Sequence, residues 1–182
     1  MSTSDLPPGW DYNPSSWAQR LPIVALAVVG GATAVYLALY QFGVIDAVWD
    51  PFFGRDSERV LDSEVSRLLP VSDAALGAFG YLLDAVTGLV GGRRRWCTLP
   101  WLVVLFGILV GPLGAVSIAL VIAQPLAVGA WCSLCLATAA ISVAMIAPAL
   151  DEVLASLQYL KRVREQDRPH FWPVFWGRRA AT

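Results

Sequence analysis

The sequence predicts an all-α integral membrane protein: a four-helix bundle with a short interfacial helix in the first outer loop and an amphipathic C-terminal extension. Of the 182 residues, 57% are apolar, and the mean hydropathy is +0.59. Several apolar runs are long enough to cross about 30 Å of hydrocarbon. The net charge of −1 comes with no basic patch outside the membrane-flanking positions, which excludes nucleic-acid binding.

The chain divides into three segments. Residues 1–20 are polar and interrupted by prolines, which predicts a flexible leader. They lack the basic region and the cleavage site of a signal peptide. Residues 21–150 form the predicted four-span membrane domain, and residues 151–182 form a tail with an amphipathic helix and an aromatic, basic end. We expect that end, from Phe171 to Trp176, to lie at the membrane interface.

The first span is predicted over residues 22–45, with Pro22 in the first helical turn. The following loop is acidic and carries aromatic residues at 49–53 that are typical of the headgroup level. Residues 56–69 have the pattern of a short helix, with Asp56 or Ser57 as N-cap and one apolar side. This helix is expected to lie in the interface, either as a lid or as a plain surface helix.

The second span is predicted over residues 72–90 and contains Asp84. An ionisable residue within a span suggests a functional site, but its position favours a side chain that reaches toward the arginines at 93–95. The third span follows over residues 97–123, and an uncharged connection leads to the fourth span at 131–150.

The fourth span opens with two cysteines, Cys132 and Cys135, at i and i+3. At this spacing the sulfurs share a helix face, and the start of a helix stabilises a thiolate, so the pair suits dithiol–disulfide exchange. Two inert packing cysteines are the alternative. A zinc site is disfavoured because only Cys97 and His170 remain as typical ligands, and no metal is predicted.

The basic residues predict the topology. The arginines at 93–95 and the basic tail should be cytoplasmic, which places both termini inside and the CxxC motif near the outer face of the cytoplasmic membrane. That side is oxidising, whereas Cys97 falls on the reducing side. No haem, flavin or nucleotide motif is present, so the predicted electron acceptor is a quinone dissolved in the lipid bilayer.

Three stretches together resemble the vitamin K epoxide reductase family. They are Arg59-Val60-Leu61-Asp62-Ser63, the segment from Ser72 to Tyr81, and Trp131-Cys132-Ser133-Leu134-Cys135, and the likeness covers about residues 21–150. The resemblance implies a redox-active CxxC with menaquinone or ubiquinone as co-substrate and a thioredoxin-like extracytoplasmic thiol protein as partner. It also implies that Cys135 lies nearer the quinone, that Cys132 exchanges with the partner, and that the quinone site contains Ser63, Asp73 and Trp131.

The sequence departs from the family pattern at three positions. The two loop cysteines that pass electrons to the CxxC correspond here to Trp49 and Ser57, and a tyrosine of some members corresponds to Ala139. The leading hypothesis is therefore a membrane thiol:quinone oxidoreductase that forms extracytoplasmic disulfides and engages its partner through Cys132 directly. The alternative is a quinone- or partner-binding scaffold subunit without turnover. A small transporter is disfavoured because no paired half-sequences with interrupted helices are seen.

Overall fold

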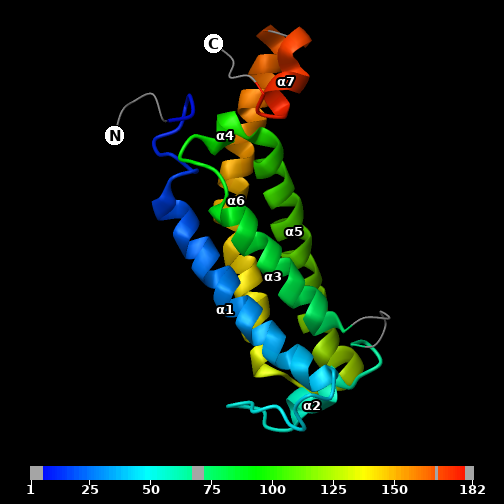
Figure 1. Ribbon diagram of the computed structural model, residues 1–182. Helices are drawn as coiled ribbons and strands as arrows, with labels where there is room; N and C mark the ends of the chain where they lie inside the picture. The colour runs from blue at the N-terminus through cyan, green and yellow to red at the C-terminus, as the bar shows by residue number, and fades with distance from the viewer. Residues whose placement is uncertain (1–5, 67–71, 167, 179–182) are drawn as a thin grey trace.

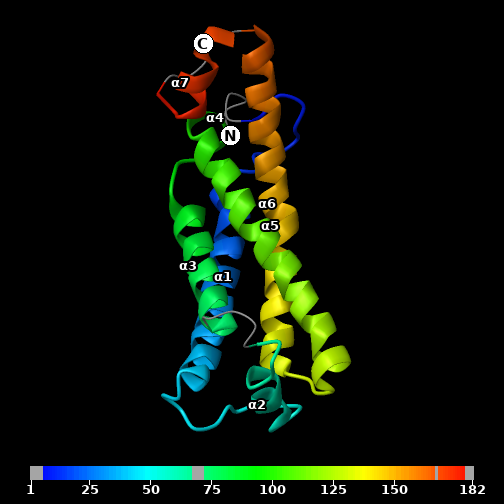
Figure 2. The ribbon, with the colours of Figure 1, turned by 90° about the vertical axis from the view of Figure 1, so that its right-hand side faces the viewer.

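The computed structural model describes residues 6–66, 72–166 and 168–178, and in these residues all regular structure is helical. The predicted all-α fold is confirmed. Four long helices make up the bundle in Figures 1 and 2: α1 (Trp17–Gln41), α3 (Asp73–Leu89), α5 (Pro100–Ala123) and α6 (Ser133–Gln166). Five short elements connect or follow them in the described residues: α2 (Asp56–Leu61), α4 (Arg95–Thr98), the π-helical turn η2 (Gln124–Val128), the turn η3 (Arg168–His170) and α7 (Phe171–Phe175).

Three of these helices are long and apolar enough to cross a membrane: α1, α5 together with η2, and α6. The fourth, α3, has 17 residues, which is near the lower limit for a span, and it packs along α1. The bundle core is apolar, with Phe106 and Met145 fully buried between the helices. Close approach of α1 and α3 depends on Gly30, where an added Cβ would lie 2.6 Å from the ring of Tyr81.

Several helix boundaries differ from the predicted ones. Helix α1 begins at Trp17, so Pro22 lies inside it rather than in its first turn. Asn13 and Ser15, expected in a flexible leader, are buried. Helix α6 joins the predicted fourth span and the predicted amphipathic helix over 151–166 into one helix, and Glu152 within it is buried in an ion pair.

The helix of the first loop is shorter than predicted. Helix α2 covers Asp56–Leu61, residues 62–66 form turns, and the predicted part from 67 to 69 lies outside the described residues. Its N-cap is Arg55, which makes no side-chain capping bond, rather than Asp56 or Ser57. The Ser57 hydroxyl does not cap the helix because it donates a hydrogen bond to Asp50.

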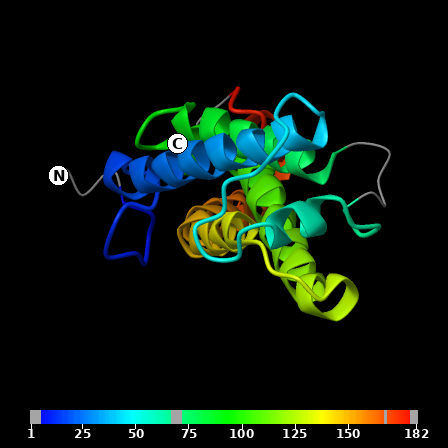
Figure 3. The same cartoon turned by 90° about the horizontal axis from the view of Figure 1, so that it is seen from below.

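The bundle has two distinct ends (Figure 1). Helix α2 and the start of α6 lie at one end, here called the CxxC end, whereas both termini, α4 and α7 lie at the other. Cys97 belongs to α4 and is therefore at the opposite end from Cys132 and Cys135. Seen from the CxxC end, the loop between α1 and α2 passes across the start of α6 (Figure 3).

The expectation that Asp84 reaches toward the arginines is wrong. Asp84 is fully buried in α3, and neither of its carboxylate oxygens has a hydrogen-bond partner among the described residues. Arg95 instead forms a buried ion pair with Glu152 of α6 and donates to the carbonyl of Thr87. Arg20 donates to the carbonyls at the end of α3, such as that of Gly88 at 2.9 Å. These carbonyls have no partner within the helix, so the guanidinium groups satisfy them.

Candidate functional site

Cys132 and Cys135 form a disulfide at the start of α6, with their Cα atoms 5.2 Å apart. The Cys132 carbonyl accepts the first hydrogen bond of the helix, from the Leu136 N–H at 2.9 Å, and the Cys135 N–H donates to the Cys132 sulfur at 3.1 Å. The pair therefore lies at the positive end of the helix dipole, where a thiolate is stabilised when the disulfide is reduced.

The two cysteines have different surroundings. Cys132 has no solvent exposure and packs against Val60 of α2 and Ala130. Cys135 is partly buried and lines two cavities inside the bundle. The first-loop helix thus covers one sulfur, while the other faces the interior.

Asp50 holds the first loop against the CxxC motif. Its carboxylate accepts hydrogen bonds from the backbone N–H and the hydroxyl of Ser133, the former at 2.8 Å, and from the hydroxyl of Ser57. The N–H groups of Phe52 and Phe53 also donate to it, each at 2.9 Å. Burial alone would raise the pKa of the Asp50 carboxyl, but the hydrogen bonds outweigh burial and hold this pKa well below its ordinary value.

The larger cavity has a volume of about 440 Å³ and lies between all four long helices. It occupies the region where α3 and α5 draw apart toward the CxxC end (Figure 2). Its walls are mainly apolar side chains, among them Leu37, Leu76, Leu113 and Val116. Its few polar lining side chains in the described residues are Asp73, Ser117, Gln124, Cys135 and Thr138. A mainly apolar cavity of this size with few polar groups is typical of a small-molecule site.

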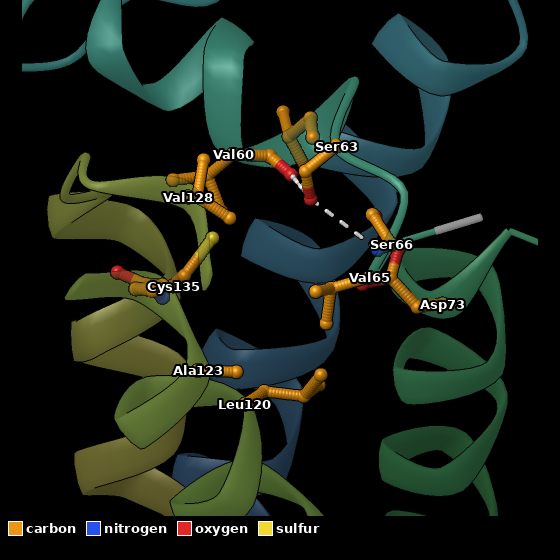
Figure 4. A pocket seen from close by; sticks show the side chains of 11 residues that line it. Val60, Ser63, Val65, Ser66, Asp73, Leu120, Ala123, Val128 and Cys135 are labelled. Carbon is orange, nitrogen blue, oxygen red and sulfur yellow. Dashed lines mark hydrogen bonds between the residues drawn. The ribbon is translucent and has the colours of Figure 1, made fainter. Parts of the chain in front are cut away.

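A smaller cavity of about 50 Å³ lies directly under the first loop. Figure 4 shows its lining: Cys135 on one side with its sulfur pointing into the space, Asp73 on the opposite side, and Ser63 on the loop. The two cavities share five lining residues: Leu61, Asp73, Leu120, Gln124 and Cys135. Together they extend from the covered end of the bundle into its apolar interior.

The structure brings together two of the three predicted quinone-binding residues. Asp73 lines both cavities, and Ser63 lines the smaller one, where its hydroxyl donates to the Val60 carbonyl at 2.6 Å. Trp131 lines neither cavity and is 38% exposed. Of the positions that depart from the pattern, Ser57 is buried against Asp50 and Ala139 lines the larger cavity.

Sequence reasoning missed three polar residues of this site: Asp50, Gln41 and Gln124. The Gln41 amide donates to Asp73 at 2.6 Å, and the Gln124 side chain accepts from the Cys132 N–H at 3.1 Å. Each binds a residue that the sequence did single out. Nothing in the local pattern marks them, because their roles depend on contacts made across the bundle.

Comparison with known proteins assigns the chain to one family. Residues 21–150 match the vitamin K epoxide reductase family. The chain belongs to that family. No curated protein and no solved structure gives a significant match.

The resemblance seen in the three sequence stretches is thereby confirmed. Vitamin K epoxide reductase family membership makes the chain an oxidoreductase of the thiol–disulfide type, and its helices make it an integral membrane protein. The family generally uses quinone substrates and typically works with thioredoxin-like partners. In the part of the chain that the structure describes, no group of three or more His, Cys, Asp or Glu side chains is placed to hold a metal ion.

Proposed function

We propose that the protein is a membrane thiol:quinone oxidoreductase that couples the Cys132–Cys135 pair to quinone reduction and to disulfide formation outside the cytoplasm. The observation that carries the proposal is the position of Cys135. Its sulfur points into the smaller cavity, and this cavity shares lining residues with the larger apolar cavity of about 440 Å³. A quinone ring needs such an apolar space next to the electron donor.

The reaction balances with the groups at hand. Oxidation of the two thiols to a disulfide releases two electrons and two protons, and a quinone takes up the same number to become a quinol. A dithiol of a thioredoxin-like protein then reduces the Cys132–Cys135 disulfide by thiol–disulfide exchange and leaves as a disulfide. Cys135 is the thiol nearer the quinone, and Cys132 is the one that the partner attacks.

The quinone, menaquinone or ubiquinone, enters from the lipid between α3 and α5. Leu76 of α3 and Val116 of α5 both line the larger cavity, and they are 43% and 56% exposed, so apolar surface leads from the bundle exterior to its interior. Ser63 and Asp73 lie at the inner wall and contact the ring. Trp131 lines neither cavity, so the proposed ring site does not include it.

Exchange with a partner requires the first loop to move. Cys132 is fully buried under Val60, and Asp50 joins the loop to Ser133 at the start of α6. In place of loop cysteines, this protein carries a hydrogen-bonded cover over its CxxC motif. The cover excludes water while the quinone reacts and opens for the partner protein.

The distribution of charge supports an orientation with the CxxC end outside. Arg94, the N-cap of α4, and the basic residues Lys161, Arg162 and Arg164 near the end of α6 lie at the end that carries α4 and α7. Arg55 and Arg59, at the CxxC end, are each paired with a neighbouring acidic residue. On the positive-inside rule, we propose that the termini are cytoplasmic and that the disulfide lies near the outer face of the cytoplasmic membrane.

Single-cysteine variants test the proposal. In a Cys135→Ala protein, the Cys132 thiolate can attack the disulfide form of an outer-surface thiol protein and release one of its thiols, but the second CxxC thiol is lost, so the mixed disulfide should accumulate. Cys132→Ala should trap none, and Cys97→Ser should behave as the unaltered protein. Non-reducing electrophoresis with mass spectrometry identifies the adduct.

A second candidate, a quinone- or partner-binding scaffold without turnover, is favoured by the complete burial of Cys132. Absence of a mixed disulfide in both the Cys132→Ala and the Cys135→Ala protein, with normal folding of each, would support the scaffold and contradict the oxidoreductase.

A further inference from the structure

We infer that the side chain of Gln124 binds the quinone: its amide NH₂ donates a hydrogen bond to a carbonyl oxygen of the ring, while its oxygen holds the backbone of Cys132. This inference rests on the proposed function, since it assigns a residue to the quinone site. Neither the family match nor the sequence patterns point to this position.

The orientation of the amide follows from its neighbour. Gln124 is 3% exposed, and its Oε1 accepts the N–H of Cys132 at 3.1 Å. A backbone N–H can only donate, so the oxygen faces Cys132 and the NH₂ group faces the other way. One end of the side chain is thereby anchored to the CxxC motif.

The NH₂ group has no acceptor of its own. Among the described residues, no hydrogen bond is donated by the Gln124 amide nitrogen, although the side chain lines both cavities. The nitrogen is not closed off inside the protein but stays accessible from the space that Gln124 lines, so it is free to donate to a molecule bound there. A ligand acceptor in the cavity would satisfy it.

Gln124 is the lining side chain best able to donate to a quinone. The hydroxyl of Ser117 donates to the Leu113 carbonyl at 2.8 Å, and that of Thr138 to the Cys135 carbonyl at 2.9 Å, so both are engaged within their own helices. The Asp73 side chain is already an acceptor, for the Gln41 amide at 2.6 Å and the Ser66 hydroxyl at 2.7 Å. Since a quinone offers two carbonyl acceptors, the amide of Gln124 supplies the complementary group.

The local backbone directs this side chain inward. Gln124 begins the π-helical turn η2, a wide turn of a kind that is frequent at functional sites. The next residue, Pro125, has no N–H to continue the regular pattern, and Gly129 ends the turn at φ +65°. Within the same turn Leu126 is 80% exposed, whereas Gln124 is buried.

A comparison of two ligands tests the hydrogen bond. Menadione and methylnaphthalene share a ring system, but only menadione has carbonyl acceptors. With the oxidised protein in lipid nanodiscs, we expect Gln124→Met to weaken menadione binding about tenfold, in line with the loss of a buried hydrogen bond. The affinity of the Gln124→Met protein for methylnaphthalene should stay unchanged. Isothermal titration measures both affinities.

A second variant separates quinone binding from support of Cys132. Gln124→Glu keeps an oxygen for the Cys132 N–H but replaces the donor by a second acceptor, so at pH 8 it should also lose menadione affinity. Binding of menadione by Gln124→Glu at the unaltered level would show that the residue only supports the CxxC backbone, and would overturn the inference. The same holds if Gln124→Met binds menadione normally.

Different results would contradict the quinone site and the role of Gln124. If the unaltered protein binds menadione no better than methylnaphthalene, the proposed quinone site itself is contradicted. If the unaltered protein prefers menadione and both variants keep that preference, quinone binding stands and only the role of Gln124 falls.

Discussion

At the scale of single residues, Asp50 is the group on which the geometry of the CxxC end depends. It is 9% exposed and accepts five hydrogen bonds, two of them from Ser133 between the cysteines. A hydrogen bond to a charged group contributes about 1.5–3 kcal/mol to stability, more than a bond between neutral groups. The carboxylate thus joins the first loop to the redox helix.

Asp50→Asn should lower the free energy of unfolding by about 2 kcal/mol at pH 7, because the NH₂ end of the amide cannot accept the bonds that one carboxylate oxygen accepts. It should also speed the alkylation of Cys132 in the reduced protein, because the loop is released. Thermal unfolding in detergent and the rate of maleimide labelling measure these two effects.

The pH dependence gives the control for this prediction. The pKa of Asp50 is lowered in the folded protein, so its stabilising contribution is complete above the unfolded pKa of about 4 and is lost as the pH falls toward the folded value. The stability difference from Asp50→Asn should be constant from about pH 5 to 8 and shrink below about pH 4. A difference that grows on acidification would contradict the assignment.

The residues of the site differ in how far the sequence reveals them. Cys132 and Cys135 are predictable because their chemistry is complete within a short motif at the start of an apolar run. Asp50 is not, because its partner Ser133 is 83 positions away. Gln124 escapes notice since an isolated glutamine at the end of a span has no pattern of its own.

At the scale of elements, the hydropathy of the chain predicts the four long helices, but side-chain pairing sets where several of them begin and end. The sequence predicts that the fourth span ends at residue 150 and that the chain continues as an amphipathic helix over residues 151–166. In the structure Glu152 is 1% exposed and paired with Arg95, and α6 continues to Gln166. Charge in a sequence marks the end of a span only when no counter-charge is buried with it.

Glu152→Gln should destabilise the protein by about 3 kcal/mol, because it leaves the buried guanidinium of Arg95 without its counter-charge. The matched control is Glu165→Gln on the same helix, where the partner Lys161 is 4.0 Å away and both side chains are exposed. The control should change stability by less than about 0.5 kcal/mol. Thermal unfolding of both variants in the same detergent measures the two changes in stability. An equal loss of stability in both variants would argue against a buried ion pair.

Packing of α1 against α3 gives a second prediction at this scale. Gly30→Ala places a methyl group 2.6 Å from the ring of Tyr81, whose hydroxyl is held by the Thr138 carbonyl, so the ring cannot withdraw freely. We expect a loss of about 1–3 kcal/mol. Gly111→Ala is the control, because nothing lies within 4 Å of the added carbon. It should be neutral or slightly stabilising, and a similar loss in both variants would mean that the close contact is not the cause.

At the scale of the whole molecule, the two ends of the bundle carry different chemistry. One end holds the disulfide and the first-loop residues that cover it, and the other holds the termini and a buried cluster of Arg20, Arg95 and Glu152. The sequence predicts this separation because spans alternate in direction. It does not predict the cover over Cys132, which depends on contacts between segments that are distant in the chain.

Orientation in the membrane is testable with one exposed position at each end. Arg55 is 94% and Lys161 is 77% exposed in their side chains. In a Cys97→Ser background, an impermeant maleimide should label Arg55→Cys in intact cells and label Lys161→Cys only after the membrane is permeabilised. The reverse pattern would place the CxxC end in the cytoplasm and remove the proposed route to an extracytoplasmic partner.

The most direct test of the central claim is a single-turnover titration of the reduced protein with a quinone under anaerobic conditions. Quinone absorbance follows the acceptor, and alkylation with mass spectrometry follows the thiols of Cys132 and Cys135. We predict one quinol formed for each disulfide formed, and none in the Cys135→Ala protein. Quinone that binds but stays oxidised while both thiols remain reduced would contradict the account.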